Sequence, residues 1–528
     1  MSQRVIVIGG GPNGLVAACV LGKAGLKPLV LERLPSLGGC AATSRLAPGF
    51  HCPTLSHRAA IDPSVARSLE LARHGLDMVS PAALVSSAMP DGRMLTLWAD
   101  AGRAAREIAA FSAHDAERYP RFLTSFSRVS AVLQAVMAAN PLSIDQISAP
   151  DLVMLVGAAR KLRRLDRADA RRLLRWMPMP VADLVSEWFE SESLRTLVAA
   201  EGLLGAFLGP RSPGSSLQLL LLGAREGHPI STGRMPRGGM AALVTALTRA
   251  AREAGAEIRV DAEVREIRVQ DGRATGVVLA TGEEVTARVV LSSADPRRTF
   301  GLVDPAHLAP DFIRRVRGIR MRGTLAKVNY AVSSLPRFAG LDRADEGDQR
   351  ARLSGGVRLC SGMTALERAF DRAKYGELPT DPWIELMVPS ITDPDLAPEG
   401  QHVVSAYVQF APFTLRKTSW DHERDQLGDV TTRTIATYAP QFPSTVVARE
   451  VVTPLDLERT YGLTGGQIFH GELALDQIFL ARPFLGWARY SAPIRHLFLC
   501  GSGVHPGTGL DGRSGALAAR AVVKSGLC

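Results

Sequence analysis

Three glycines near the start of the chain are spaced for binding the phosphates of a dinucleotide. Gly9, Gly11 and Gly14 form a G-x-G-x-x-G pattern directly after the apolar residues 5–8 and before a helical stretch. The first glycine permits a tight turn, the second lets a pyrophosphate approach the backbone, and the third lets helix and strand pack closely. Glu32 follows about 20 residues after these glycines, at the position where a carboxylate can bind a ribose diol. The pattern predicts a dinucleotide site and leaves FAD and NAD both open.

Further glycines extend the predicted site at both ends of the chain. Gly38 and Gly39 allow a second close approach of the backbone, just after the ribose-binding acid. A glycine-rich turn also separates an apolar strand at 497–500 from a helix at 513–524. This turn directs a second helix N-terminus at the cofactor, which a simple nicotinamide dehydrogenase does not need, so it favours FAD. The predicted cofactor-binding residues are Gly9, Gly11, Pro12, Asn13, Gly14, Glu32, Arg33, Gly38, Gly39, Gly501, Leu510, Asp511 and Gly512.

Two histidines are the candidate polar neighbours of the flavin, and neither is assigned as a general base. His57 lies in residues 47–65, which we interpret as irregular chain forming a wall of the active site, because long ordered loops are uncommon unless functional. His505 lies in the C-terminal turn. His470, in a polar patch at 468–477, is interpreted as structural. The catalytic residues are therefore unknown from the sequence.

Composition argues against several classes of function. The six cysteines include no C-x-x-C pair and no metal-ligand spacing, which argues against a dithiol redox enzyme and a metal site and fits a reducing cytoplasm. The net charge of +10 comes mostly from Arg and lacks the interleaved aromatic residues of RNA-binding proteins, so we expect no nucleic-acid partner. No window reaches about 18 uninterrupted apolar residues, so no transmembrane helix is expected.

A basic amphipathic stretch covers residues 151–175, where leucines alternate with arginines. Such a helix can lie on anionic lipid, so peripheral membrane contact stays open as an alternative. The simpler interpretation is a solvated face over a helical subdomain. The predicted location is the cytoplasm, with or without that membrane contact, and no feature of the sequence indicates an oligomeric state.

The elements around these motifs predict a discontinuous cofactor-binding domain in segments 1–95, 235–300 and 490–528. Its strands are expected at 5–8, 29–31, 257–260, 285–291 and 497–500, with a meander at 264–269 and 274–279. Helical periodicity between 101 and 201 predicts that 96–234 is the helical part of a substrate domain. The rest of that domain, 301–489, has strands expected at 325–332, 383–388 and 402–410 that suit one wall of a substrate cavity.

Taken together, the motifs resemble those of the flavin-dependent desaturase superfamily, which includes bacterial-type phytoene desaturases, flavin-type carotene ketolases and retinol saturases. The resemblance covers nearly the whole chain. Its marks are residues 5–32, Gly38-Gly39, Glu187-Trp188-Phe189, Ser212-Pro213-Gly214, Pro236-Arg237-Gly238-Gly239-Met240, Ser292-Ser293-Ala294-Asp295-Pro296, Leu475-Asp476-Gln477 and residues 499–507.

The resemblance implies an α/β fold: an FAD-binding Rossmann-like domain of the glutathione reductase/amine oxidase type, a mixed α+β substrate domain and a helical subdomain. It also implies an FAD contact near Val264 and, for a eukaryotic relative, a mitochondrial location. Two departures concern the cofactor. Cys40 stands where many relatives have Ala or Arg, and Thr508 and Asp511 interrupt a turn that in relatives is often an unbroken glycine run.

The leading hypothesis is an FAD-dependent oxidoreductase that transfers a hydride between a small lipophilic substrate and the flavin. No second G-x-G-x-x-G directly follows a strand, so a quinone or oxygen is favoured as electron acceptor over a built-in NAD(P) site. The runner-up is a carotenoid desaturase or ketolase. A third hypothesis is a flavoprotein with a mainly binding or regulatory role.

Overall fold

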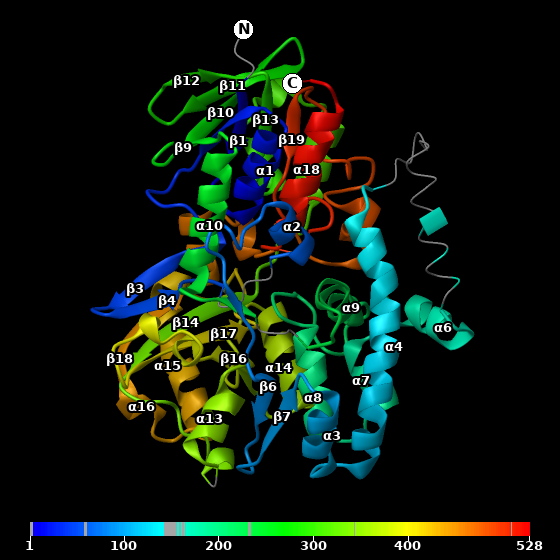
Figure 1. The fold of residues 1–528 in the computed structure, drawn as a ribbon, viewed down its shortest axis with the longest axis vertical. Helices are drawn as coiled ribbons and strands as arrows, with labels where there is room; N and C mark the ends of the chain where they lie inside the picture. Colours follow the sequence, from blue (N-terminus) through cyan, green and yellow to red (C-terminus); the bar gives the residue numbers. More distant parts are fainter. Residues whose placement is uncertain are drawn as a thin grey trace.

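A parallel sheet forms the upper part of the molecule in Figure 1, and its strands come from distant stretches of the chain. The computed structural model describes residues 4–56, 61–141, 156–157, 160, 163, 165–230, 234–342, 344–507 and 509–527. The strand order is β19-β13-β1-β2-β9, and every neighbouring pair is parallel. These strands are β1 (Arg4–Ile8), β2 (Lys27–Leu31), β9 (Glu257–Arg259), β13 (Val289–Ser292) and β19 (Leu497–Leu499).

Three helices pack together against this sheet. α1 (Pro12–Lys23) contacts both α10 (Gly239–Glu253) and α18 (Arg513–Lys524). A Cβ on Gly515 of α18 would come within 2.1 Å of the carbonyl oxygen of Asn13, so the two helices approach this closely only because the residue is glycine. The N-terminal and C-terminal segments are thereby held side by side (Figure 1).

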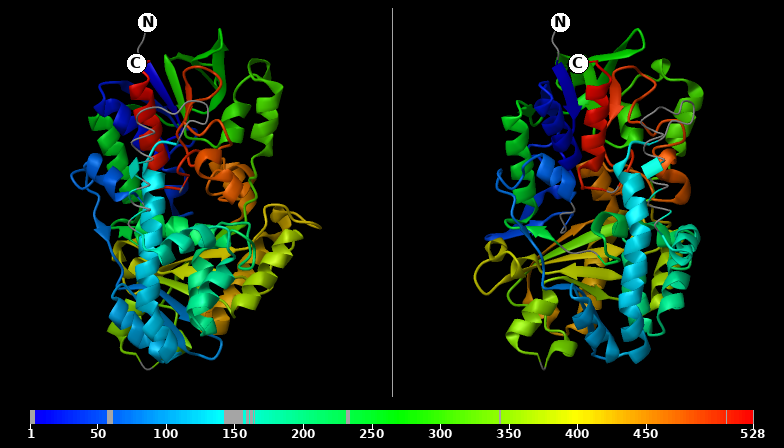
Figure 2. Two further views of the ribbon diagram at one scale, coloured as in Figure 1. Left: turned by 90° about the vertical axis from the view of Figure 1, so that its right-hand side faces the viewer. Right: turned by 45° about the vertical axis from the view of Figure 1, so that its right-hand side comes forward.

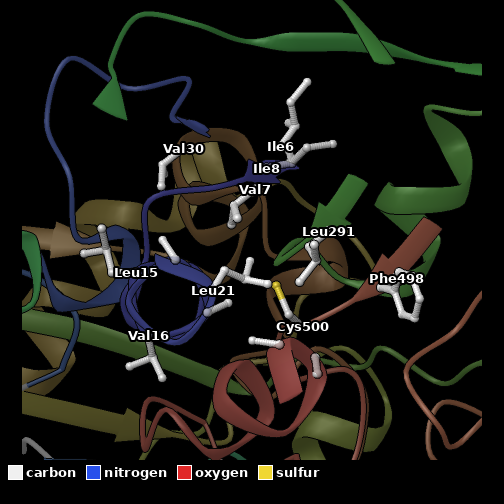
Figure 3. Close-up of a cluster of buried hydrophobic side chains, with 14 of the residues drawn as sticks. Ile6, Val7, Ile8, Leu15, Val16, Leu21, Val30, Leu291, Phe498 and Cys500 are labelled. Atoms are coloured by element: carbon white, nitrogen blue, oxygen red, sulfur yellow. The ribbon is translucent and has the colours of Figure 1, made fainter. Parts of the chain in front are cut away.

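Apolar side chains from these segments form one continuous core, shown in part in Figure 3. Ile8 of β1 and Leu15 of α1 belong to it, and so do Leu291 of β13 and Phe498 of β19. Strands covered on both faces are expected to be almost wholly apolar, as residues 5–8 are. The core therefore explains why a strand of four buried residues directly precedes the first glycine.

A larger, mixed sheet lies below (Figure 1). Its order is β18-β14-β17-β16-β15-β6-β7, and all pairs are antiparallel except β15 with β6. The strands are β6 (Ala83–Ala88), β7 (Met94–Trp98), β14 (Leu325–Val332), β15 (Gly356–Leu359), β16 (Ile384–Met387), β17 (His402–Gln409) and β18 (Val446–Val452).

Helices from the middle of the chain pack beside the larger sheet. The long helix α4 runs along the side of the molecule in both figures of the fold and contacts α9. Aromatic rings, among them Phe122 and Trp188 at 5.4 Å between centroids, fill the space around it. The helices are α3 (Ala101–Ala109), α4 (Ala113–Ala138), α6 (Arg167–Trp176), α7 (Val181–Trp188), α8 (Glu192–Glu201) and α9 (Ser215–Glu226).

The remaining strands and α-helices of the described chain connect or flank these elements. The strands are β3 (Thr43–Ala47), β4 (Phe50–Pro53), β5 (Met78–Val79), β8 (Met235–Pro236), β10 (Val264–Gln270), β11 (Arg273–Leu279) and β12 (Glu284–Thr286). The helices are α2 (Pro63–Ser68), α11 (Pro296–Gly301), α12 (Pro310–Gly318), α13 (Glu346–Leu353), α14 (Met363–Lys374), α15 (Trp420–Tyr438), α16 (Phe442–Thr445) and α17 (Pro454–Tyr461).

The predicted fold class is confirmed, but three local expectations differ from the structure. Residues 285–291 form two strands, because β12 joins the meander whereas β13 joins the parallel sheet. Residues 47–65 are not wholly irregular, since β4 pairs with β3 and α2 begins at Pro63. The predicted cofactor-binding segment 1–95 contains β6 and the first residues of β7. Both strands belong instead to the lower sheet, which they join through the parallel pairing of β6 with β15.

Ten residues of the predicted basic helix at 151–175, all before residue 165, lie outside the described residues. Its last part is α6, in which Asp166 caps the helix by accepting from the backbone N–H of Asp169 at 2.7 Å. Among the helices that the structure describes, none is long and apolar enough to cross a membrane.

Candidate functional site

A cleft of about 1020 Å³, open solvent included, lies at the carboxyl ends of β1 and β2. Ligands of open parallel sheets bind outside the carboxyl ends of the strands, so this is the expected position for a nucleotide. Nine of the predicted cofactor-binding residues line it: Gly9, Gly11, Pro12, Asn13, Glu32, Arg33, Gly39, Val264 and Leu510.

The start of α1 leaves its first backbone N–H groups available to an anion. The N-cap residue is Gly11, which has no side chain to accept from them, and the first turn contains no acidic residue. Gly9, with φ of +95°, makes the turn from β1 into this helix. A Cβ on Gly14 would lie 2.0 Å from the carbonyl oxygen of Gly9, so Gly14 serves the close packing of helix and strand and does not line the cleft.

Glu32 is held at the end of β2 by backbone donors on both sides. Its Oε2 accepts from the N–H of Gly10 at 2.7 Å, and its Oε1 accepts from the N–H of Leu34 at 2.9 Å. Each carboxylate oxygen can accept a further hydrogen bond. The side chain, only 6% exposed, is therefore fixed in a position where it lines the cleft and can bind two hydroxyl groups of a ribose.

The cleft has the space and the donors and acceptors that a dinucleotide requires. A Cβ built on Gly11 would meet no protein atom closer than 4.0 Å, so the space beside this backbone is open. Asn13 donates through Nδ2 to the carbonyl of Gly509 at 2.9 Å, whereas its buried Oδ1 has no hydrogen-bond partner among the described residues. An oriented acceptor of this kind fits a hydroxyl-bearing ligand. The residues present thus fit FAD.

Five predicted cofactor-binding residues stand behind the cleft and do not line it. Besides Gly14, these include Gly38, whose N–H donates to the carbonyl of Gly10 at 3.0 Å, and Gly501, where a Cβ would lie 2.2 Å from the carbonyl oxygen of Ser293. Asp511 is buried and accepts from the backbone N–H of Arg513 at 3.0 Å. A Cβ on Gly512 would contact Val16, Ile61 and Val65, so this glycine packs against the core.

The structure tests only one of the two candidate histidines. His57 lies outside the described residues. His505 lies against the carboxyl end of α4, and it lines neither this cleft nor the cavity described next. Burial lowers the pKa of His505 to about 4, so the ring is neutral at physiological pH. His470 does line the cleft, and burial lowers its pKa as well.

An apolar cavity of about 1160 Å³, open solvent included, adjoins the cleft. The two share Cys40, Ile468, Gly509 and Leu510, so a molecule in the cavity would meet the cofactor there. Ten of the residues that line it are leucine, isoleucine or phenylalanine: Leu55, Leu204, Leu221, Leu222, Leu325, Leu457, Ile468, Phe469, Leu473 and Leu510. We call it the apolar cavity.

Lys327 is the polar group of this cavity that the sequence prediction missed. It lies on β14, is 2% exposed, and donates through Nζ to the carbonyls of Leu55 at 2.8 Å and Pro53 at 3.2 Å. Its Nζ lies 4.8 Å from the ring centre of Tyr407 on the neighbouring strand. Burial lowers the pKa of Lys327 to about 8, so Nζ can both hold and release a proton near neutral pH. A lysine within an almost wholly apolar strand was the signal in the sequence.

A carboxylate in the wall of the apolar cavity is already ion-paired within the protein. Glu201, at the end of α8, lines the cavity and forms a buried ion pair with Arg358, which also donates to Glu385 at 3.1 Å. The three side chains are each at most 3% exposed. Glu201 is therefore committed to this buried network, which positions α8 against the sheet.

Comparison with known proteins supports the same cofactor. The chain is 36% identical to pyridine nucleotide-disulfide oxidoreductase domain-containing protein 2 of Rattus norvegicus, over 98% of this chain and 93% of the relative. It is 26% identical to a phytoene desaturase (lycopene-forming) of Pseudescherichia vulneris, over 97% and 96% of the two chains. The five cysteines that the structure describes are all unpaired.

A solved structure shows the same fold. Cyclohexylamine oxidase from Brevibacterium oxydans superposes with a TM-score of 0.57 at 16% sequence identity, covering 99% of each chain. The model of the family described as flavin containing amine oxidoreductase matches residues 13–523. The chain therefore belongs to the flavin containing amine oxidoreductase family, with FAD as its cofactor.

Proposed function

We propose that this protein transfers a hydride between a small lipophilic substrate and FAD. The observation that carries the proposal is the apolar cavity, which shares four lining residues with the FAD cleft. Pockets lined by apolar side chains with a few placed polar groups are typical of small-molecule sites. Bound FAD supplies the two-electron chemistry, and the protein must orient the substrate and exclude water.

Each part of the cavity has a role in this proposal. Leu221 and Leu222 of α9, with Leu325 of β14, bind the apolar substrate and keep water out. Lys327 holds or accepts a proton at Nζ, since its pKa of about 8 makes both the protonated and the neutral amine accessible near neutral pH. Tyr407 orients the lysine through its ring face.

A second candidate is a carotenoid desaturase or ketolase. The similarity to a phytoene desaturase over nearly the whole chain favours it. The two candidates differ in substrate length, and expression in a polyene-producing host separates them. Accumulation of a newly coloured product would support the second candidate, whereas an unchanged pigment would favour a smaller substrate.

The partner that reoxidises the flavin and the location of the protein are also proposals. We propose a quinone or oxygen as electron acceptor, because the other G-x-G-x-x-G of the sequence, at 507–512, does not directly follow a strand and belongs to the C-terminal turn assigned to FAD. We further propose a cytoplasmic location, with the basic residues 151–175 as the part of the chain that would touch an anionic membrane.

The test is anaerobic bleaching of the bound flavin by lipophilic polyenes, retinoids, fatty acyl compounds and amines. We expect at least one of these classes to bleach the visible flavin band in the FAD-loaded protein. Bleaching by amines alone would identify the substrate as an amine, which loses the hydride from the carbon next to nitrogen. Bound FAD that none of the classes bleaches would favour the binding or regulatory role.

A further inference from the structure

A second, basic cleft opens beside the apolar cavity, between α2, α4, α9 and α18. It has a volume of about 900 Å³, open solvent included. Four arginines line it, whereas Asp62 is the only acidic residue among the described residues of its wall. Arg67 and Arg520 are exposed and Arg225 is partly buried. The fourth is Arg513, which is 8% exposed. We call this the basic cleft.

Arg513 is held rigidly in the wall of the basic cleft. Its Nε donates to Oδ2 of Asp62 at 2.7 Å, and its Nη2 also pairs with that carboxylate. Its buried Nη1 has no hydrogen-bond partner among the described residues. Guanidinium groups bind carboxylates and phosphates through paired N–H donors, so an oriented donor here fits an oxyanion.

The single acid of the basic cleft does not cancel its charge. Asp62 is already paired with Arg513, and its Oδ1 accepts from the backbone N–H groups of Ser64 at 2.8 Å and Val65 at 3.1 Å as the N-cap of α2. Arg225 pairs with Glu226 at 2.8 Å, and Arg513 also lies 3.9 Å from the carboxylate of Asp511. The positive charge in excess around the cleft is therefore that of Arg67 and Arg520. The cleft therefore favours an anion and disfavours a cation.

One face of α9 connects the basic cleft with the apolar cavity. Gln218, Leu221, Leu222 and Arg225 all line the apolar cavity, and their spacing of three to four residues places them on one side of the helix. Arg225 also lines the basic cleft. A molecule whose apolar part lies along the leucines would thus present its end to the arginines.

From this arrangement we propose that the basic cleft binds the anionic head group, a phosphate or carboxylate, of an amphipathic substrate whose apolar part occupies the apolar cavity. The substrate role rests on the proposed function, whereas binding of the anion does not. The cleft gives this enzyme a preference among lipophilic molecules for those that end in an oxyanion.

Equilibrium binding to the FAD-loaded protein tests the proposal without requiring turnover. The probes are dodecyl phosphate, dodecanol and inorganic phosphate, with perturbation of the flavin spectrum and the shift in melting temperature as readouts. We expect dodecyl phosphate to bind about tenfold or more tightly than dodecanol, because hydrogen bonds from arginine to a phosphate are charge-assisted and those to a hydroxyl group are weaker. Inorganic phosphate should bind more weakly than dodecyl phosphate and compete with it.

Two exposed arginines provide a variant that should fold normally. The double variant Arg67→Gln/Arg520→Gln should reduce the preference for dodecyl phosphate to less than about threefold and leave dodecanol binding unchanged. Arg121→Gln, which removes a 72% exposed arginine from α4 outside the cleft, is the matched control and should retain the preference.

Three results would overturn the proposal. Equal binding of dodecyl phosphate and dodecanol would show that no head group is recognised. An undiminished preference for dodecyl phosphate over dodecanol in the double variant would place the anion elsewhere. Inorganic phosphate that binds as tightly as dodecyl phosphate would identify a site for the free anion. Failure of the proposed function has a different signature, namely that dodecyl phosphate binds as expected while no compound bleaches the flavin.

Discussion

The FAD cleft and the apolar cavity adjoin each other, but they are built from different parts of the chain. The cleft uses mainly backbone groups of short, contiguous motifs, such as the turn at Gly9–Gly11 and the start of α1. The cavity uses side chains from α8, α9, β14 and β17 and from the loops near Leu55 and Ile468. Backbone geometry accepts few substitutions, whereas side chains can be exchanged while the wall is preserved. The cleft therefore determines the cofactor, and under the proposed function the cavity determines the substrate.

The largest expected effect is at the glycine that packs behind the cleft. Gly14→Ala places a Cβ 2.0 Å from the carbonyl oxygen of Gly9, which is backbone and cannot move aside. We expect the free energy of unfolding to fall by about 2–3 kcal/mol or more and FAD to be lost from the purified protein. Thermal unfolding and FAD content measure both. Gly301→Ala, where a Cβ would meet nothing within 4 Å, is the control, and equal losses in both variants would refute the packing role.

The next effect separates cofactor binding from folding. Glu32→Ala removes the carboxylate that we place on the ribose, and the affinity for FAD should fall by about 10- to 100-fold, as expected for hydrogen bonds to a charged group. Titration of the FAD-free protein measures this. Glu399→Ala, which removes an exposed carboxylate far along the chain, should bind FAD normally. Unchanged FAD affinity in Glu32→Ala would show that this carboxylate points elsewhere.

A pH-dependent effect is specific to the cavity. Lys327 has a pKa of about 8 in the folded protein and its ordinary value of 10.5 in the unfolded chain. Between pH 8 and 10.5 Lys327 therefore carries a proton more often in the unfolded chain than in the folded protein. Burial of the charged lysine lowers the free energy of unfolding by its full amount below pH 8, and this loss disappears as the pH rises towards 10.5.

Lys327→Met removes this titration. Relative to the variant, the wild type should gain up to about 3 kcal/mol of stability between pH 8 and 10.5, with FAD content unchanged. Melting temperatures of both proteins across that range measure the difference. Parallel pH profiles would mean that Lys327 titrates normally.

The smallest effect is expected at His505, outside both sites. Its pKa of about 4 keeps the ring neutral between pH 5 and 8. His505→Gln should therefore leave the rate of flavin reduction within about twofold of wild type and its pH profile over that range unchanged, because the ring touches no reacting atom. A large loss of rate with FAD retained would instead give His505 a role in the chemistry.

The same difference between cleft and cavity explains which features could be predicted from the sequence. The loop at Gly9–Gly14 and helix α18 follow local rules of turns, caps and periodicity, so they were recognisable in isolation. Lys327 and Leu222 become neighbours of one cavity only when β14 packs near α9, and no local pattern encodes that contact. Asp511 has the right type and place in the sequence for a cofactor contact, but its carboxylate turns towards Arg513.

The most direct test of the account is the rate of flavin reduction in a variant whose cavity is filled. Leu222→Trp should retain FAD, because Leu222 lines the cavity and not the cleft, and should slow bleaching by the preferred substrate by roughly tenfold or more. Leu174→Trp, which places the same ring at a residue 71% exposed, should behave as wild type. Equal bleaching rates in wild type and Leu222→Trp, with FAD fully bound in both, would contradict the claim that substrates reach the flavin through this cavity.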